Sequence, residues 1–177
     1  MKINLGCGKR NFGSEWIHID GNNYDHIDST DIINFDYSNV EIIYASHVIE
    51  YFDRYEILDI LINWKSKLKK NGILRLAVPD FEKMSSLYSK KKFELDSFLG
   101  PLYGRMTMDG NFIYHKTVYD EKSLRNLLKE VGFNKIRRWD WKKTIHSKYD
   151  DHSQAYLPKM DKKKGELISL NIEAIND

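Results

Sequence analysis

The chain has 177 residues, of which 41% are hydrophobic and 31% charged, so it suits one domain and is too apolar for disorder and too polar for lipid. No stretch free of Asp, Glu, Lys and Arg exceeds eight residues, which excludes a transmembrane helix of about 20 apolar residues. Residues 1–6 lack the apolar core of a secretory signal, which favours the cytoplasm. Cys7 is the only cysteine, which excludes an internal disulfide and a multi-cysteine zinc site.

The net charge of +2 is unevenly distributed. Residues 1–60 carry four basic and eleven acidic side chains, net −7, while residues 61–177 are net +9. A basic half can attract phosphates. The simpler interpretation is that these lysines lie on solvated helix faces, since several cluster near predicted helix ends, where cations suit the helix dipole.

The first half of the chain reads as strands separated by turns and one helix. Short apolar runs at 3–5, 16–19, 41–45 and 73–78 predict strands. Between the last two, apolar residues recur at spacings of four, three and four, namely Ile57, Leu61, Trp64 and Leu68. This spacing predicts a helix that residues 69–72 end, with lysines and a glycine.

The second half predicts two further helices and two strands. Asp80 can cap a helix over 81–88, and another follows Asp120 and ends at Gly132. Residues 133–139 are strand-like, and residues 168–174 alternate between apolar and polar, which predicts a strand with one better-buried face. Alternating strands and helices favour an α/β fold with a mostly parallel sheet, to which the last strand returns antiparallel.

In two segments the apolar residues follow neither the helix period nor the strand period. Residues 93–118 form an aromatic stretch punctuated by Gly and Pro, and residues 142–166 hold several His and Asp residues. Long irregular segments in compact domains tend to be lids or binding loops. We therefore expect a single domain over 1–177 with substrate or lid segments near 93–118 and 142–166.

Polar and glycine residues follow several predicted strands. In a parallel sheet the carboxyl ends of the strands form one ligand-binding rim, which places Gly6-Cys7-Gly8, Asp20 and Ser46-His47 together. The glycines permit a tight turn and a close backbone approach, and Asp20 can accept hydrogen bonds from both hydroxyls of a ribose. This pattern favours a nucleoside cofactor, with a purely structural turn as the alternative.

These residues resemble the class I S-adenosylmethionine-dependent methyltransferases, specifically a compact bacterial branch associated with surface-polysaccharide biosynthesis. The similar segments, in chain order, are residues 5–8, 17–20, 31–35, 44–50, 68–80, 131–133, 138–140, 150–158 and 169–174. The resemblance covers nearly the whole chain, and it implies a Rossmann-like, doubly wound, seven-strand-type sheet with an antiparallel last strand.

The resemblance also implies roles for individual residues around S-adenosylmethionine. The residues that would bind it are Leu5, Gly6, Cys7, Gly8, Asp20, Asp31, Ile32, Ser46 and His47. The glycine turn would line the methionine part, Asp20 would hold the ribose, and Asp31 with Ile32 would flank the adenine. Ser46 and His47 would form the floor of the cofactor site. Glu50 matches a His-x-x-Glu pattern that fixes this loop, or it caps a helix starting near Asp53.

The chain departs from the family at its start. Asn4 stands where members commonly have an acid, and only eight residues separate Gly8 from Ile17. We therefore expect a much shortened first helix. The same shortening, with Asn11 where a third glycine would be needed, argues against a dinucleotide.

Methyl transfer to a hydroxyl is helped by a general base, for which His115 is the first candidate. Behind it come His146, Asp150, Asp151 and His152, of which Asp151 is the second choice. The last four residues could also bind a divalent cation or simply form a polar loop. We expect no metal site.

The sequence constrains the methyl acceptor less than it constrains the cofactor. The three prolines are never adjacent, which disfavours a base-amine target of the Asn/Asp-Pro-Pro type. Aromatic residues of the 93–118 segment suit a saccharide or another small acceptor with a hydroxyl. Two alternatives remain open. One is a nucleic-acid methyltransferase or binding protein that uses Arg137, Arg138, Lys142 and Lys143, and the other is a catalytically silent interaction module.

Overall fold

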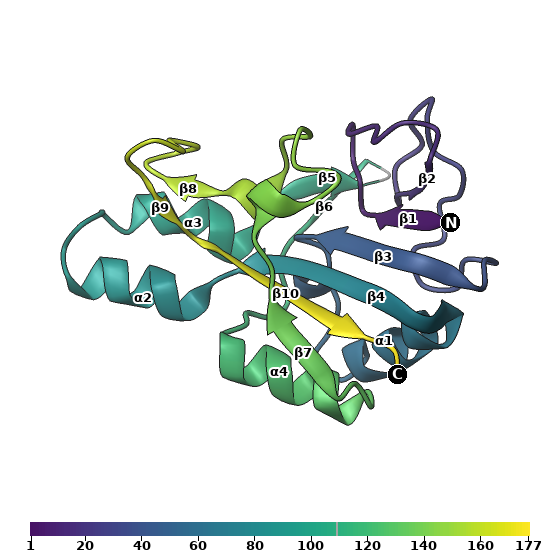
Figure 1. The fold of residues 1–177 in the computed structure, drawn as a ribbon. Coiled ribbons are helices and arrows are strands. Elements are labelled where there is room, and N and C mark those ends of the chain that lie inside the picture. The colour runs from purple at the N-terminus through teal and green to yellow at the C-terminus, as the bar shows by residue number, and fades with distance from the viewer. Residues whose placement is uncertain (109) are drawn as a thin grey trace.

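A six-stranded sheet forms the centre of the computed structural model, which describes residues 1–108 and 110–177 (Figure 1). The strand order is β2-β1-β3-β4-β10-β7. The strands are β1 Lys2–Leu5, β2 Trp16–Ile19, β3 Val40–Ser46, β4 Leu68–Pro79, β7 Lys135–Arg138 and β10 Ser169–Ile175. The first four strands in the order are parallel to one another, and β10 is antiparallel to both β4 and β7. The predicted Rossmann-like α/β fold with an antiparallel last strand is confirmed.

The sheet differs from the seven-strand expectation at its β2 edge. The resemblance implies one strand more than the six observed, and in the described part of the chain a single parallel bridge between Ile19 and Ser29 stands beside β2. The segment after β2 is rich in aspartates that bond to their own backbone; Asp31 Oδ1 accepts from the N–H groups of Ile33 and Asn34. Such local bonds compete with a strand ladder, so the edge stays a loop.

Two helices cover one face of the sheet. They are α1, Ile57–Lys67, and α4, Glu121–Glu130, which lie side by side under the strands (Figure 1). Both were predicted. The side chain of Asp120 caps α4 in a capping box with Ser123. β4 begins at Leu68, directly after the last residue of α1. The backbone of β4 turns at Asn71, where φ is +61°.

The opposite face is covered by loops and short turns rather than by long helices. Residues 6–15 between β1 and β2 contain no helix, as the shortened connection predicts. They pack with the segment that follows β7, which includes the 3-10 turns η2 Trp141–Lys143 and η3 His152–Gln154. A small aromatic core joins the two segments to the sheet, made of Phe12, Trp16, Tyr44, Ala77 and Trp139.

The segment at 93–118 is more regular than its sequence indicates. Following α2, Phe81–Ser89, it forms α3, Asp96–Tyr103, and a hairpin of β5, Met106–Met108, and β6, Asn111–Ile113. Gly100 and Pro101 gave the appearance of a break, but Phe98 buries itself in a second apolar core. That core also includes residues of α2 and of the segment around β8 Tyr156–Leu157 and β9 Glu166–Leu167. Tertiary packing therefore holds α3 together.

No helix of the described residues is long and apolar enough to cross a membrane.

Candidate functional site

The glycine turn lies at the carboxyl end of β1. Gly6 and Gly8 have φ values of +61° and +57°, which favour glycine. The Gly6 N–H donates to the carbonyl oxygen of Ile19 at 2.7 Å, which joins the turn to the end of β2. The side chain of Leu5 is completely buried in the core, so only its backbone reaches the rim.

Asp20 is joined directly to this turn. One carboxylate oxygen accepts from the Gly8 N–H and the other from the Asn22 N–H, both at 2.8 Å. The side chain is buried, yet each carboxylate oxygen has a second lone pair for a ligand. The sequence-predicted pair of glycine turn and strand-end acid is therefore in contact.

Cys7 points away from solvent between these groups. Its Sγ lies 3.6 Å from the Gly8 carbonyl oxygen and 3.9 Å from His26 Nε2. Burial, followed by the neighbouring Asp20, raises the pKa of the thiol to about 12. The thiol is therefore neutral and serves as a small packing group.

Asp31 and Ile32 lie in the loop beside the end of β2. The Asp20 N–H donates to the Ser29 carbonyl oxygen, which draws this loop to the rim. Asp31 is exposed and its Oδ1 closes a local turn, while the carbonyl oxygen of Ile32 accepts from Trp64 Nε1 at 3.0 Å. The loop is thus fastened to α1.

Ser46 and His47 end β3 next to the glycine turn. The Ser46 Oγ is buried without a hydrogen-bond partner among the described residues. His47 has a φ of +55° and its N–H donates to the Ala77 carbonyl oxygen at 2.8 Å. Burial is the main reason that the pKa of its imidazole lies well below the usual range, so His47 is neutral, with its Nε2 3.3 Å from Ser169 Oγ.

Glu50 is buried between two imidazoles. Its Oε1 lies 3.7 Å from both His47 Nδ1 and His115 Nε2, and neither carboxyl oxygen has a hydrogen-bond partner in the described structure. Glu50 belongs to the 3-10 turn η1, Ile49–Tyr51, and α1 begins only at Ile57. The helix-cap interpretation of Glu50 is therefore wrong. Burial raises the pKa of this carboxyl group to about 8, which keeps it protonated at neutral pH.

His115, the first candidate base, is enclosed by protein groups. Its side chain is only 4% exposed, and its Nδ1 lies 3.1 Å from the Pro101 carbonyl oxygen. Because a carbonyl oxygen only accepts, Nδ1 carries the proton and Nε2 faces Glu50. Burial lowers the pKa of the imidazole to about 4. His115 is thus neutral but turned toward Glu50 rather than toward an open groove.

Asp151, the second candidate, is also engaged. Its Oδ2 accepts from the Tyr44 hydroxyl at 2.5 Å and its Oδ1 from the Ser153 N–H at 2.8 Å. The residue nevertheless borders a small cavity of about 10 Å³ lined by Asn4, Gly6, Cys7, Arg10, Phe12, Ser46 and Asp151. This volume is close to the minimum for one water molecule.

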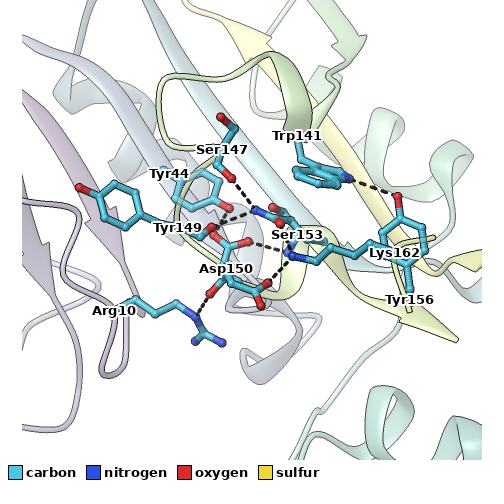
Figure 2. A network of polar contacts seen from close by, with 11 residues as sticks. Arg10, Tyr44, Trp141, Ser147, Tyr149, Asp150, Ser153, Tyr156 and Lys162 are labelled. Atoms are coloured by element: carbon cyan, nitrogen blue, oxygen red, sulfur yellow. Dashed lines mark hydrogen bonds and ion pairs between the residues drawn. The ribbon is translucent and has the colours of Figure 1, made fainter. Parts of the chain in front are cut away.

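Of the other members of the His and Asp cluster, His152 has its ring 5.1 Å from that of His47, while His146 and Asp150 lie apart from each other. His146 is buried under the loop-covered face, against Phe12 and 3.3 Å from Arg75, whereas the exposed Asp150 pairs with Lys162 at 2.9 Å (Figure 2). Within residues 1–108 and 110–177, no group of three or more His, Cys, Asp or Glu side chains is arranged to hold a metal ion.

Sequence reasoning missed Arg10, which lies beside the glycine turn. Its Nε donates to the Asp150 carbonyl oxygen at 2.7 Å (Figure 2). A cation two residues after a glycine turn is the only signal that the sequence offers for it.

The rim is closed in this conformation. The β5–β6 hairpin lies over the end of β2, with Asn22 Nδ2 donating to the Thr107 carbonyl oxygen at 3.3 Å. A Cβ added to Gly21 would stand 2.7 Å from the Met108 sulfur. A larger hollow of about 310 Å³ lies elsewhere, between residues 12–16 and 145–149, and contains none of the rim residues.

No protein-family model and no curated protein matches the chain. Solved structures do match over nearly its whole length. A methyltransferase of Thermotoga maritima, described as a possible histamine N-methyltransferase, is 13% identical with a TM-score of 0.58, over 99% of this chain and 82% of the other. A methyltransferase of Archaeoglobus fulgidus is 15% identical with a TM-score of 0.54, over 98% and 85%.

A third match contains a bound cofactor product. It is the 1,6-didemethyltoxoflavin-N1-methyltransferase of Burkholderia thailandensis with S-adenosylhomocysteine, 10% identical with a TM-score of 0.54, over 98% of this chain and 69% of the other. At these identities the likeness is one of architecture. The chain has the fold of S-adenosylmethionine-dependent methyltransferases.

Proposed function

We propose that the protein is an S-adenosylmethionine-dependent methyltransferase. The observation that carries this proposal is the contact between the glycine turn and the strand-end acid, in which the Gly8 N–H donates to Asp20 at the carboxyl edge of the sheet. This edge is where open α/β sheets bind nucleotides. The Burkholderia thailandensis structure with S-adenosylhomocysteine supports the choice of cofactor.

The residues present fit this cofactor in chemistry. Asp20 keeps free lone pairs for the ribose hydroxyls, and the buried Ser46 Oγ has no hydrogen-bond partner among residues 1–108 and 110–177, so it is available to a ligand. Gly6, Cys7 and Gly8 would line the methionine part. Asp31 and Ile32 would flank the adenine, with Ser46 and His47 beneath. The cofactor supplies a methyl group on a positively charged sulfur, and the protein must hold a nucleophile in line with it at about 3 Å.

Binding requires the rim to open. A cavity of about 10 Å³ is far below the roughly 300 Å³ or more of ligand pockets. The hairpin that carries Met108 rests on Gly21 and Asn22, beside Asp20. We therefore propose that this hairpin moves away from the end of β2 when the nucleoside enters.

For the acceptor we propose a saccharide or another small molecule with a hydroxyl, in cytoplasmic surface-glycan biosynthesis. The support is the exposed aromatic side chains near the hairpin, Tyr103, Phe112 and Tyr114, which suit the faces of a sugar ring. Of the two predicted bases, Asp151 borders the cavity, whereas His115 is turned toward Glu50. Since Asp151 already accepts two hydrogen bonds, we assign catalysis chiefly to positioning of the reactants.

The closed rim favours one alternative, a catalytically silent interaction module. A nucleic-acid role receives less support, because Arg137 pairs with Glu173 and Arg138 with Glu121. Ion pairs of this kind reduce the positive charge available to phosphates.

Calorimetry with S-adenosylhomocysteine separates these functions. We expect the wild-type protein to bind, and Asp20→Ala to lose about 1.5 to 3 kcal/mol of binding free energy. Asp25→Ala, an exposed acid of the same loop, is the matched control and should bind like wild type. No binding at millimolar ligand, with the circular dichroism of a folded protein, would leave the silent module. Transfer of a labelled methyl group to a sugar intermediate, but not to RNA, would then identify the acceptor class.

A further inference from the structure

Glu50 is a buried acid that the proposed function does not use. It is 1% exposed, and neither of its carboxyl oxygens has a hydrogen-bond partner among residues 1–108 and 110–177. Its Oε1 stands 3.7 Å from two ring nitrogens, Nδ1 of His47 and Nε2 of His115. A buried polar group without a partner costs free energy. Whether these two nitrogens carry protons therefore decides what Glu50 can do.

The hydrogen bonds on the other nitrogen of His47 show where its proton lies. Asn171 Nδ2 donates to the Ser153 carbonyl oxygen at 3.0 Å, so Asn171 Oδ1 is the end that accepts from the Ser169 hydroxyl, also at 3.0 Å. Because that hydroxyl already donates its one proton, its contact with His47 Nε2 at 3.3 Å requires the nitrogen to be the donor. His47 is neutral, and its Nδ1 therefore faces Glu50 as an acceptor.

The same reasoning applies to His115. Its Nδ1 donates to the Pro101 carbonyl oxygen at 3.1 Å and the ring is neutral, so its Nε2 also faces Glu50 as an acceptor. A carboxylate between these nitrogens would meet only lone pairs, whereas a carboxyl O–H can donate to one of them at a time. Since an O–H or N–H bond spans about 2.5 to 3.2 Å, the carboxyl group must shift from its midway position toward one ring.

No stronger charge competes for this proton. Within the described residues, no lysine or arginine lies within ion-pair distance of Glu50. The other titratable side chains near enough to feel its charge are Tyr51 and Tyr119. Burial raises the pKa of Tyr51 to about 12 and that of Tyr119 above its usual range, so both hydroxyls stay neutral. The ring of His152 lies 5.1 Å from that of His47.

The two histidines belong to different parts of the molecule. His47 follows β3 at the rim, and His115 follows β6 at the foot of the β5–β6 hairpin (Figure 1). The Tyr51 hydroxyl donates to the Gly104 carbonyl oxygen at the other foot, and a Cβ on Gly104 would overlap the His115 ring. A movement of the hairpin therefore displaces His115, while the backbone of His47 stays bonded to β4.

We infer that Glu50 is a positioning residue whose single O–H alternates between His47 and His115 and so couples the base of the hairpin to the rim. When the hairpin is seated, the bond to His115 holds its foot. When the hairpin lifts, the O–H turns to His47 and steadies the end of β3. The shared O–H follows from the donors and acceptors of the chain itself, whereas its link to cofactor entry rests on the proposed function.

Nitrogen-15 NMR of the histidine rings tests the sharing. The unprotonated ring nitrogen changes its chemical shift when it accepts a hydrogen bond, so His47 Nδ1 and His115 Nε2 each report on Glu50. Glu50→Gln places an amide with two protons between the rings and can serve both, whereas Glu50→Met places none. We expect both wild-type shifts at pH 7 to lie between those of the two variants. Glu56→Gln, at an exposed acid of the same connection, is the matched control and should match wild type.

Two results overturn the sharing. One is a wild-type shift equal to that of Glu50→Gln at one ring and to that of Glu50→Met at the other, which means a proton fixed on one histidine. The other is a doubly protonated ring at either histidine. Raising the pH past about 8, the pKa of the carboxyl group, should move both wild-type shifts away from those of Glu50→Gln, which stay constant. This comparison holds even if Glu50→Met does not fold, and constant wild-type shifts up to pH 10 overturn the inference.

S-adenosylhomocysteine tests the coupling to the rim. Because one O–H serves both rings, saturating ligand should move the two wild-type shifts in opposite directions, His47 toward the bonded value and His115 toward the unbonded one. Glu50→Gln should show no such opposition. Movement in the same direction, or at His47 alone, overturns the coupling while the proposed function stands. If the ligand does not bind to folded wild-type protein at millimolar concentration, the proposed function fails and the link to cofactor entry fails with it, while the ligand-free shifts still decide the sharing.

Discussion

The two faces of the central sheet are buried by different means. On the helix-covered face, apolar side chains of the strands, among them Leu74, Leu76 and Ile172, meet α1 and α4 in one large core. On the loop-covered face, the alternate positions of the same strands hold Tyr44, Arg75, Asn171 and Glu173 among others, under aromatic rings and turns.

This contrast shows that burial and apolarity are separate properties. Glu173 is 3% exposed and Arg75 12%, and they lie 2.7 Å apart, with Arg137 on the other oxygen of Glu173. Burial of an apolar group is favourable by itself, whereas a buried charge is tolerated only with its partners. The helix-covered face should therefore respond to lost volume and the loop-covered face to lost partners.

Removing volume from the helix-covered face should have a large effect. Trp64 of α1 is completely buried, and Trp64→Ala should lower the free energy of unfolding by about 3 to 5 kcal/mol, measured by urea denaturation, because a cavity remains. Ile62 of the same helix is 46% exposed, and Ile62→Ala should change stability by no more than about 0.5 kcal/mol. Similar losses for both variants would contradict the described packing of α1.

Removing a partner from the loop-covered face should cost a comparable amount for another reason. Glu173→Ala leaves the buried Arg75 without its counter-charge, and we expect a loss of about 3 to 5 kcal/mol in the same denaturation assay. The double variant Arg75→Met with Glu173→Met should lose much less stability than the sum of the losses measured for Arg75→Met alone and Glu173→Met alone. Additive losses would show that the pair is not coupled and would remove the distinction between the faces.

Glu50, which lies at the rim between the two faces, should make the free energy of unfolding depend on pH. Its pKa is raised by burial to about 8 in the folded chain, against an ordinary value of 4.5. Between these values the folded state holds a proton that the unfolded state has released, so stability from Glu50 is present below pH 4.5 and is lost as pH rises toward 8.

Glu50→Gln removes this titration. Its free energy of unfolding relative to wild type should rise between pH 5 and pH 8, with a slope of about one proton. His146→Gln serves as the opposite control. Burial lowers the pKa of His146 to about 3, so the contribution of this residue is lost as pH falls from 6.5. A difference between Glu50→Gln and wild type that stays constant with pH would argue against a protonated Glu50.

The smallest effect should come from a helix end. Asp120 accepts from the Ser123 N–H at 2.7 Å in the capping box of α4. Asp120→Ala should cost about 1 kcal/mol in urea denaturation, while Asp120→Asn, which retains an accepting oxygen, should cost less. Equal costs for Ala and Asn would mean that the carboxylate charge, rather than the cap bond, stabilises the helix.

Part of the candidate site followed from the sequence because it is local. The positive φ values of Gly6 and Gly8 and the placement of Asp20 at a strand end follow from residue type and from position along short apolar runs. The surroundings of Arg10 and part of those of Glu50 could not be placed in this way. Arg10 bonds to residue 150 and Glu50 lies beside His115 as well as its sequence neighbour His47, and only the folded chain brings the distant residues near.

The strand β10 shows the same limit. Its alternation of apolar and polar residues predicted one better-buried face, but Ser169, Asn171 and Glu173 on the polar face are buried as well. Periodicity reports how residues alternate about a strand, and it does not report what lies above each face.

By itself, therefore, the sequence determined the helices α1, α2 and α4, the strand-and-turn order and the composition of the rim, since periodicity, caps and glycine conformations act over a few residues. Only the tertiary structure decided that α3 forms around Gly100 and Pro101, that loops cover the polar face, that His115 is turned toward Glu50 and that Arg10 bonds to the backbone of residue 150. Those features depend on contacts between distant segments, whose energies no local pattern contains.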